Sequence, residues 1–251
     1  FRKTGAENQI SYEIAGLEWL SRANGAAVAP VLDSGPGWLE EPHLREVRPT
    51  AEHARQFGTG LALTHAAGAD WLGQGPPGFG GDGSVASAPI PLCSKEQAPN
   101  SWGAFFAECR VLPYLRAFGG REKQTIIDFC AALAEGRWDH PQPALVEGAA
   151  ARTHGDLWGG NVLWTEKGAV LIDPLAAGGH AETDLANLGL FGSPHLPDII
   201  AGYQEVSPLA PGWQGRVRLH QMHLLALHAY LFGGGYVRQT VEVAAHYLRS
   251  G

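Results

Sequence analysis

One stretch, from His154 to Asp173, constrains the fold of this chain more than any other. It reads HGDLWGGN, the apolar run VLW, the turn TEKG, and the apolar run AVLI that ends at Asp173. Two short apolar runs around a glycine-containing turn predict a β-hairpin. Because Asn161 precedes the first strand and Asp173 follows the second, the hairpin should bring both side chains to one edge. Asp156 lies one loop away.

The residue types at this edge predict a site for Mg²⁺ and phosphate. An amide oxygen and carboxylates are hard ligands of the kind that Mg²⁺ takes up beside substrate phosphates. An aspartate, an asparagine five residues later and a strand-borne aspartate, in that order, are typical of the catalytic loop and metal site of kinases. Each residue alone favours an ordinary turn, whereas the ordered set with a hairpin favours the kinase site.

The residues within these motifs restrict the resemblance to particular groups of kinases. With HGD at 154–156 and IDP at 172–174, the chain resembles small-molecule kinases of the aminoglycoside and choline kinase type. The phrases HGDLWGGNVLW, VLIDP and GHAETDLANLGLFG are more narrowly similar to the fructosamine (ketosamine) kinase family. The sequences NSW at 100–102 and LFGGGY at 231–236 extend the similarity from Lys3 to the end of the chain.

The resemblance implies an α+β, two-lobed protein-kinase-like fold, with a small N-terminal β lobe and a larger, mainly helical C-terminal lobe. The apolar period changes from strand-like to helical after Pro49, which places the boundary there. Residues 1–49 would form a partial nucleotide-binding lobe, and residues 50–251 would carry the catalytic loop, metal site and substrate site. Residues 28–33 and 43–49 are predicted strands of the first lobe.

The N-terminal residues fit the ATP-binding part of such a site. Lys3 would hold the ATP phosphates, and Glu13, on a predicted helix with apolar residues at 14, 17 and 20, would pair with Lys3; Glu18 is the rival. Lys3 alone favours an exposed surface lysine. A kinase fold also needs two strands and a glycine-rich loop before this lysine, and none precedes Phe1.

Residues 43–49 would supply the hinge strand of the nucleotide site. In this interpretation the backbone near Glu46 and Val47 meets the adenine. Arg45 and Arg48 interrupt a run that is usually more apolar, so the register of the hinge stays open.

The resemblance assigns the chemistry to three residues of the HGD–IDP stretch. Asp156 would accept the proton of the substrate hydroxyl or aim that hydroxyl at ATP. Asn161 and Asp173 would hold Mg²⁺ against the phosphates.

Four further residues are expected around these three. Trp158, with Gly159 beside it, would line the sugar pocket; a place in the core is the alternative for Trp158. His154 and Asp184 would support the catalytic loop, and capping of the helix predicted from Leu185 is the alternative for Asp184.

Helical periodicity predicts most of the second lobe. Residues 102–118, with a break at Pro113, and residues 126–133 are predicted helices, and two more lie at 216–231 and from 237 to 248. Residues 73–100 are rich in Gly, Pro and Ser and predict a loop. His220, His223 and His228 share helical spacing with leucines and lack a nearby Cys or carboxylate, which favours packing over a metal site.

Composition excludes several other functions. With 18 Lys and Arg against 25 Asp and Glu, the formal net charge is −7 and no basic stripe is present, which disfavours nucleic acid and anionic membranes as partners. No apolar run approaches the roughly 20 residues of a membrane span. Three cysteines, an odd number without metal spacing, favour a reducing compartment and predict a cytoplasmic protein.

The resemblance therefore implies an ATP- and Mg²⁺-dependent kinase that phosphorylates a sugar hydroxyl of ketosamines, free or on a protein, in a deglycation role. An aminoglycoside- or choline-type phosphotransferase is one alternative. A non-enzymatic kinase-like binding module is the other.

Overall fold

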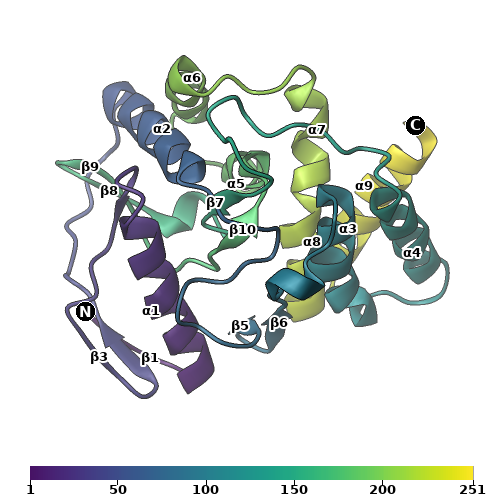
Figure 1. The fold of residues 1–251 in the computed structure, drawn as a ribbon, viewed down its shortest axis with the longest axis horizontal. Coiled ribbons are helices and arrows are strands. Elements are labelled where there is room, and N and C mark those ends of the chain that lie inside the picture. The colour runs from purple at the N-terminus through teal and green to yellow at the C-terminus, as the bar shows by residue number, and fades with distance from the viewer. Residues whose placement is uncertain (251) are drawn as a thin grey trace.

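The computed structural model describes residues 1–250 and has an α+β fold (Figure 1). Its N-terminal sheet is antiparallel, in the order β1 (Arg2–Thr4), β4 (Trp38–Glu40) and β3 (Asp33–Gly35). Helix α1 (Glu7–Ser21) packs against β4 and presents Ile10, Leu17 and Leu20 to the interior. The chain thereby brings Lys3 of β1 beside the helix that carries Glu13.

A second sheet contains the predicted hairpin, which is confirmed. β8 (Val162–Thr165) and β9 (Gly168–Leu171) are antiparallel, and β2 (Ala27–Val28) pairs with β9 in parallel. β7 (Ala151–Thr153) enters the loop that precedes the hairpin, and β10 (Ala177–Gly179) leaves the segment that follows it. These two strands pair with each other, so both ends of the HGD–IDP stretch are held together.

Helices make up most of the remaining chain, in two groups. One group shares a hydrophobic core with the hairpin: α2 (Ala51–Ala66), α5 (Ala181–Leu188), α6 (Leu196–Val206) and α7 (Trp213–His220). The other surrounds a larger core at the right of Figure 1: α3 (Trp102–Phe105), the π-helical η2 (Phe106–Val111), the 3₁₀-helical η3 (Leu112–Ala117), α4 (Gly120–Ala134), α8 (Met222–Phe232) and α9 (Gly235–Ser250).

The prediction of one strand at residues 28–33 and another at residues 43–49 is wrong, because neither segment forms a continuous strand. Pro30 lacks an N–H and interrupts the first, so its ends join two different sheets as β2 and β3. Residues 43–49 form no regular strand, and the Val47 N–H donates to the Trp164 carbonyl. The strand of this region lies earlier, at β4.

Several helix boundaries also differ from the predictions. Helix α5 begins at Ala181, four residues before Leu185, because the His180 side chain caps it by accepting the Glu182 N–H. The helix predicted at 216–231 is interrupted at Gln221, which separates α7 from α8. Helix α6 was not predicted.

The long loop and the break at Pro113 are as expected. Residues 73–100 contain only short elements: the hairpin of β5 (Gly83–Val85) and β6 (Ala88–Ile90), and the 3₁₀ turn η1 (Lys95–Gln97). At Pro113, which has no N–H to donate, the helical run changes to η3. Among the described residues, no helix has the length and apolar character that a membrane crossing requires.

Helices α2 and α6 approach each other through glycines. A Cβ on Gly58 would overlap the carbonyl oxygen of Ile199, and one on Gly202 would overlap that of Arg55. The contact therefore depends on the missing side chains. It matters for the site because α2 also carries His65.

Replacing Gly58 with alanine should destabilise the fold by about 1–3 kcal/mol, because backbone rather than a flexible side chain must move. Gly215→Ala, in α7, is the matched control: no heavy atom lies within 4 Å of its new Cβ, and alanine should stabilise that helix by about 0.5–1 kcal/mol. Denaturant unfolding of both variants measures the difference. Equal midpoints would contradict the close packing of α2 and α6.

Candidate active site

The loop that starts at His154 is anchored on a buried carboxylate. Asp184, fully buried on α5, accepts the backbone N–H of His154 at 2.7 Å and that of Gly155 at 3.0 Å. His65 Nε2 lies 3.1 Å from the same carboxylate. Burial opposes ionisation of Asp184, but the bonds to His65 and to the loop backbone outweigh it and hold its pKa below the ordinary value. An anion therefore fixes the start of the loop.

His154 connects the loop to the IDP segment. Its Nε2 donates to the Ile172 carbonyl at 2.9 Å, since a carbonyl can only accept. Its Nδ1 accepts the Asp156 N–H at 3.3 Å. Burial lowers the pKa of His154, so the ring is neutral at pH 7. The ring sets the spacing between Asp156 and the segment that carries Asp173.

Asp156 and Asn161 form a pair across the loop. Asn161 Nδ2 donates to the Asp156 carbonyl at 2.8 Å and to its carboxylate Oδ2 at 3.0 Å. Burial raises the pKa of Asp156 to about 7, although the bond from Asn161 opposes the shift. A carboxyl with a pKa near neutrality suits proton transfer at physiological pH.

Lys3 lies between two carboxylates. Its Nζ is 2.8 Å from Glu13 Oε2 and 2.9 Å from Asp173 Oδ1. Burial lowers the pKa of Lys3, but the two carboxylates more than compensate and raise it above its ordinary value. Glu18 instead forms an exposed pair with Arg22 at 3.1 Å. The structure thus decides which glutamate of α1 pairs with Lys3.

Asp173 has an unusual backbone conformation. Its φ is +53°, in the left-handed region where few residues other than glycine are found. Aspartate tolerates this region better than most side chains, and such strain is concentrated at functional sites. The turn lets the chain leave β9 and aim the carboxylate of Asp173 back at Lys3.

Two neighbouring cavities meet at Lys3 and Asp173, which line both. The first, of about 340 Å³, is walled by Ala29, Leu44, Glu46, Leu163 and Ile172, among others. The second, of about 250 Å³, is lined by side chains of α1, of β5 and of the loop, including Tyr12, Glu13, Ser84, Asp156, Trp158 and Asn161. The two cavities have room for two different molecules, and both molecules would contact Lys3 and Asp173.

Seven of the eleven candidates line these cavities, His154 and Asp184 hold the loop as described above, and the remaining two line neither cavity. Val47 does not line the first cavity, and its N–H is already donated to Trp164 at 2.8 Å. Gly159 lies in the 3₁₀ turn η4 (Gly159–Asn161), where a Cβ would lie 2.6 Å from the Gly192 carbonyl oxygen. The missing side chain of Gly159 therefore serves the packing of the loop.

Trp158 is half-buried and lies outside the hydrophobic cores. Its ring lines the second cavity and contacts Phe191 edge-to-face, with ring centroids 5.8 Å apart. An aromatic side chain is thus part of the wall of the cavity that Asp156 also lines.

Sequence reasoning missed Glu41. This buried residue lines the first cavity, and its carboxylate belongs with those of Glu13 and Asp173 to a group whose oxygens lie within 4.8 Å of one another. Burial raises the pKa of Glu41, and its Oε1 has no hydrogen-bond partner. Its only sequence signal was a charge next to Pro42 at the end of a short apolar strand.

A lysine held by a glutamate, an Asp–Asn loop and a second aspartate at the end of a hairpin define a kinase-type phosphotransferase site. The profile of the family described as fructosamine kinase matches residues 3–250. The chain belongs to the fructosamine kinase family.

Individual relatives agree with the family match. An assigned ketoamine kinase of Vibrio parahaemolyticus is 33% identical over 194 residues, which cover 75% of this chain and 61% of that protein. The ketosamine-3-kinase of Mus musculus is 29% identical, covering 96% of this chain and 84% of that protein. The chain therefore spans about three-fifths of the length of the Vibrio relative.

Solved structures agree as well. A crystal structure of a Thermobifida fusca protein assigned as a fructosamine-3-kinase matches with a TM-score of 0.85 and 39% identity, over 98% of this chain and 82% of that one. Aminoglycoside and choline kinases, at 12% and 14% identity, share the fold.

The raised pKa of Asp156 predicts that Asp156→Asn stabilises the protein at high pH. A pKa raised from 3.8 to about 7 on folding favours the protonated form. That contribution is fully present below the ordinary pKa and is lost as pH rises through about 7. Asparagine stays neutral, so the variant should exceed wild type by roughly 1–2 kcal/mol at pH 8, after allowance for solvent screening, and by nothing at pH 4.

Melting temperatures measured from pH 4 to pH 8 test this. Asp128→Asn, on the exposed face of α4, is the matched control and should show no such pH dependence. A difference in melting temperature between Asp156→Asn and wild type that stays constant from pH 4 to pH 8 would mean that folding does not raise the pKa of Asp156.

Proposed function

We propose that this protein transfers the γ-phosphoryl group of ATP to a sugar hydroxyl of ketosamines, such as fructosamines or ribulosamines, free or on proteins. The observation that carries the proposal is the meeting of two cavities at Lys3 and Asp173, with Asp156 and Asn161 on the second. The family match adds the class of acceptor, since relatives are named as ketoamine and ketosamine kinases. The role would be the removal of sugar adducts.

ATP would occupy the first cavity. Its apolar walls, from Ala29, Leu163 and Ile172, suit the adenine ring, and the backbone near Glu46, which also lines this cavity, would meet the edge of the ring. The phosphates would then reach Lys3, which Glu13 holds in place at 2.8 Å. This role divides the chain into a nucleotide-binding lobe, residues 1–49, and a catalytic lobe, residues 50–251.

Asn161 and Asp173 would hold Mg²⁺. The amide nitrogen of Asn161 donates to Asp156, which leaves its oxygen for a cation. Asp173 supplies a carboxylate and the nearby Glu41 adds negative charge, so the donor set is the all-oxygen one that Mg²⁺ prefers. The ion would neutralise charge on the transferred phosphoryl group.

Asp156 would receive the proton of the acceptor. The hydroxyl oxygen attacks the γ-phosphorus, the bond from that phosphorus to the ADP oxygen breaks, and the hydroxyl proton moves to the Asp156 carboxylate. Two hydrogen bonds fix the position of Asp156. Asn161 Nδ2 donates to its carboxylate, and the backbone N–H of Asp156 donates to His154 Nδ1. His154 and Asp184 act through the position of the loop.

Trp158 would form a wall of the sugar subsite. The apolar face of a sugar stacks well on an aromatic ring, which also excludes water from the reacting hydroxyl. The edge-to-face contact with Phe191 helps to fix the position of this ring. The net charge of −7 is compatible with an amine-bearing, cationic acceptor.

Two alternatives remain as outcomes of the test. A phosphotransferase for aminoglycosides or choline would use the same Lys3, Asp156 and Asp173 and shares the fold. A kinase-like binding module would bind ATP without turnover; the presence of Asp156 and Asn161 together with Asp173 argues against it, because binding of ATP alone does not require Asp156.

Wild-type full-length protein should phosphorylate a small fructosamine in preference to an aminoglycoside or choline. Asp156→Asn should lower the single-turnover rate by about 10²–10⁴ with nucleotide affinity nearly unchanged, because the carboxylate contacts the hydroxyl and not the nucleotide. Asp128→Asn controls for the loss of a carboxylate elsewhere. If only an aminoglycoside or choline is phosphorylated, the acceptor is not a ketosamine and the first alternative holds. If ATP binds without turnover, the protein is a binding module.

Trp158→Ala should damage transfer to the fructosamine far more than background ATP hydrolysis, with a small change in melting temperature. Trp138→Ala is the control: that ring stacks on Phe129 in the larger core, at 5.4 Å between centroids, so its loss should lower the melting temperature. A core tryptophan truncated to alanine costs about 3–5 kcal/mol. A Trp158 variant that melts much lower yet transfers normally when cold would remove Trp158 from the sugar subsite.

A further inference from the structure

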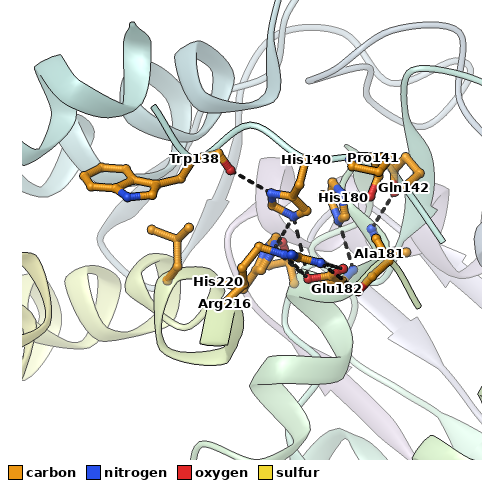
Figure 2. Close-up of polar contacts among 12 residues, drawn as sticks. Trp138, His140, Pro141, Gln142, His180, Ala181, Glu182, Arg216 and His220 are labelled. Carbon is orange, nitrogen blue, oxygen red and sulfur yellow. Dashed lines mark hydrogen bonds and ion pairs between the residues drawn. The ribbon is translucent and has the colours of Figure 1, made fainter. Parts of the chain in front are cut away.

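Three histidines from distant parts of the chain, two of them buried and His140 half-buried, converge on one point (Figure 2). His140 lies in the segment after α4, His180 caps α5, and His220 ends α7. Ring nitrogens of all three lie within 4.8 Å of one another. The Nε2 atoms of His140 and His220 are 3.0 Å apart.

A carboxylate faces the same point. Glu182 Oε2 lies 3.6 Å from His140 Nε2 and 3.5 Å from His220 Nε2. Arg216 holds Glu182 from the other side, with Nε 2.9 Å from Oε2 and a terminal nitrogen 2.6 Å from Oε1. Figure 2 shows Glu182 beside Arg216 and His220, with His140 and His180 above it in this view.

Backbone carbonyls decide the tautomers of two rings. His140 Nδ1 is 2.8 Å from the Trp138 carbonyl, which can only accept, so Nδ1 carries the proton and Nε2 has a free lone pair. His180 Nε2 is 3.3 Å from the Pro141 carbonyl, so by the same reasoning Nε2 carries the proton of that ring. Its Nδ1 accepts the Glu182 N–H. For His140, orientation by a carbonyl on the far ring nitrogen is the usual arrangement of a metal-binding histidine, whereas both ring nitrogens of His180 are already bonded.

His220 can present a lone pair without losing a proton. Its Nδ1 is 2.8 Å from the hydroxyl of Thr183, which both donates and accepts. Without a cation the proton lies on His220 Nε2, shared with His140. With a cation the proton moves to Nδ1 and Thr183 accepts it.

The spacing fits tetrahedral coordination. Metal bonds of about 2.0–2.1 Å at tetrahedral angles place ligand atoms about 3.3 Å apart. The three separations among His140 Nε2, His220 Nε2 and Glu182 Oε2, of 3.0, 3.6 and 3.5 Å, bracket that value. Small side-chain shifts would complete such a site.

We propose that His140, His220 and Glu182 bind a transition-metal ion of the zinc type, with a water as the fourth ligand. Two imidazoles and a carboxylate are a common zinc donor set. His140 and His180 also line a cavity of about 490 Å³, which provides access for the ion. The site is separate from the proposed Mg²⁺ site and does not depend on kinase activity.

The ion would brace the support of the catalytic loop. It would join the segment at His140 to α7 and to the start of α5, and α5 carries Asp184 two residues after Glu182. Asp184 in turn holds the N–H groups of His154 and Gly155. The role of the metal is therefore structural, and its loss should show in stability before it shows in chemistry.

The test uses tag-free, full-length protein that has been stripped with chelator. Wild type should take up one equivalent of Zn²⁺ after dialysis, and its melting temperature should rise. Co²⁺ should give the intense visible absorption of a tetrahedral site, which surface binding does not produce. This measurement needs no variant. Wild type that binds no Zn²⁺, or gives no tetrahedral Co²⁺ spectrum, overturns the proposal.

Variants locate the site. His140→Gln and Glu182→Gln should each weaken Zn²⁺ binding by about 100-fold or more and abolish the Co²⁺ spectrum. His223→Gln is the matched control, since His223 is also buried but bonds the Arg110 carbonyl at 3.1 Å outside the cluster. Unchanged Zn²⁺ affinity in His140→Gln, or an equal loss in His223→Gln, would place the bound metal elsewhere and overturn the proposal.

Discussion

The site depends on one buried anion. Asp184 has no solvent around it and is ionised because the N–H groups of His154 and Gly155 and the ring of His65 surround it. An unpaired carboxylate at this depth would be strongly destabilising. The loop must therefore stay on Asp184, and the position of Asp156 follows from that contact.

Close backbone packing completes the support. Gly155 has a φ of +82°, and a Cβ there would overlap the Leu175 carbonyl oxygen. The outgoing and returning ends of the HGD–IDP stretch therefore touch without an intervening side chain. The pairing of β7 with β10 fixes the same two ends from the other side. Together these contacts explain how a loop and a hairpin can hold Asp156 and Asp173 around one cavity.

Electrostatics at the site favour binding over stability. The carboxylates of Glu13, Glu41 and Asp173 gather around a single lysine, and burial raises the pKa of Glu13 and of Glu41. Excess negative charge in a partly buried place raises the energy of the ligand-free protein. A cation would relieve that repulsion, so the feature that costs stability would favour the Mg²⁺ that we propose for this site.

Local patterns in the sequence determined the hairpin, most of the helices and the Asp156–Asn161–Asp173 set, because strand and helix periodicity and motif order are properties of neighbouring residues. Only the tertiary structure decided that Glu13 rather than Glu18 pairs with Lys3, since both lie on one helix and burial separates them. It also moved Val47 away from the first cavity, because the chain after β4 bonds to Trp164 instead of forming a strand. His140, His180 and His220 lie 40 residues apart along the chain, so no local pattern could bring them together. The sequence suggested grouping His220 with His223 and His228, because their spacing is helical. In the folded protein His220 instead lies beside His140 and His180.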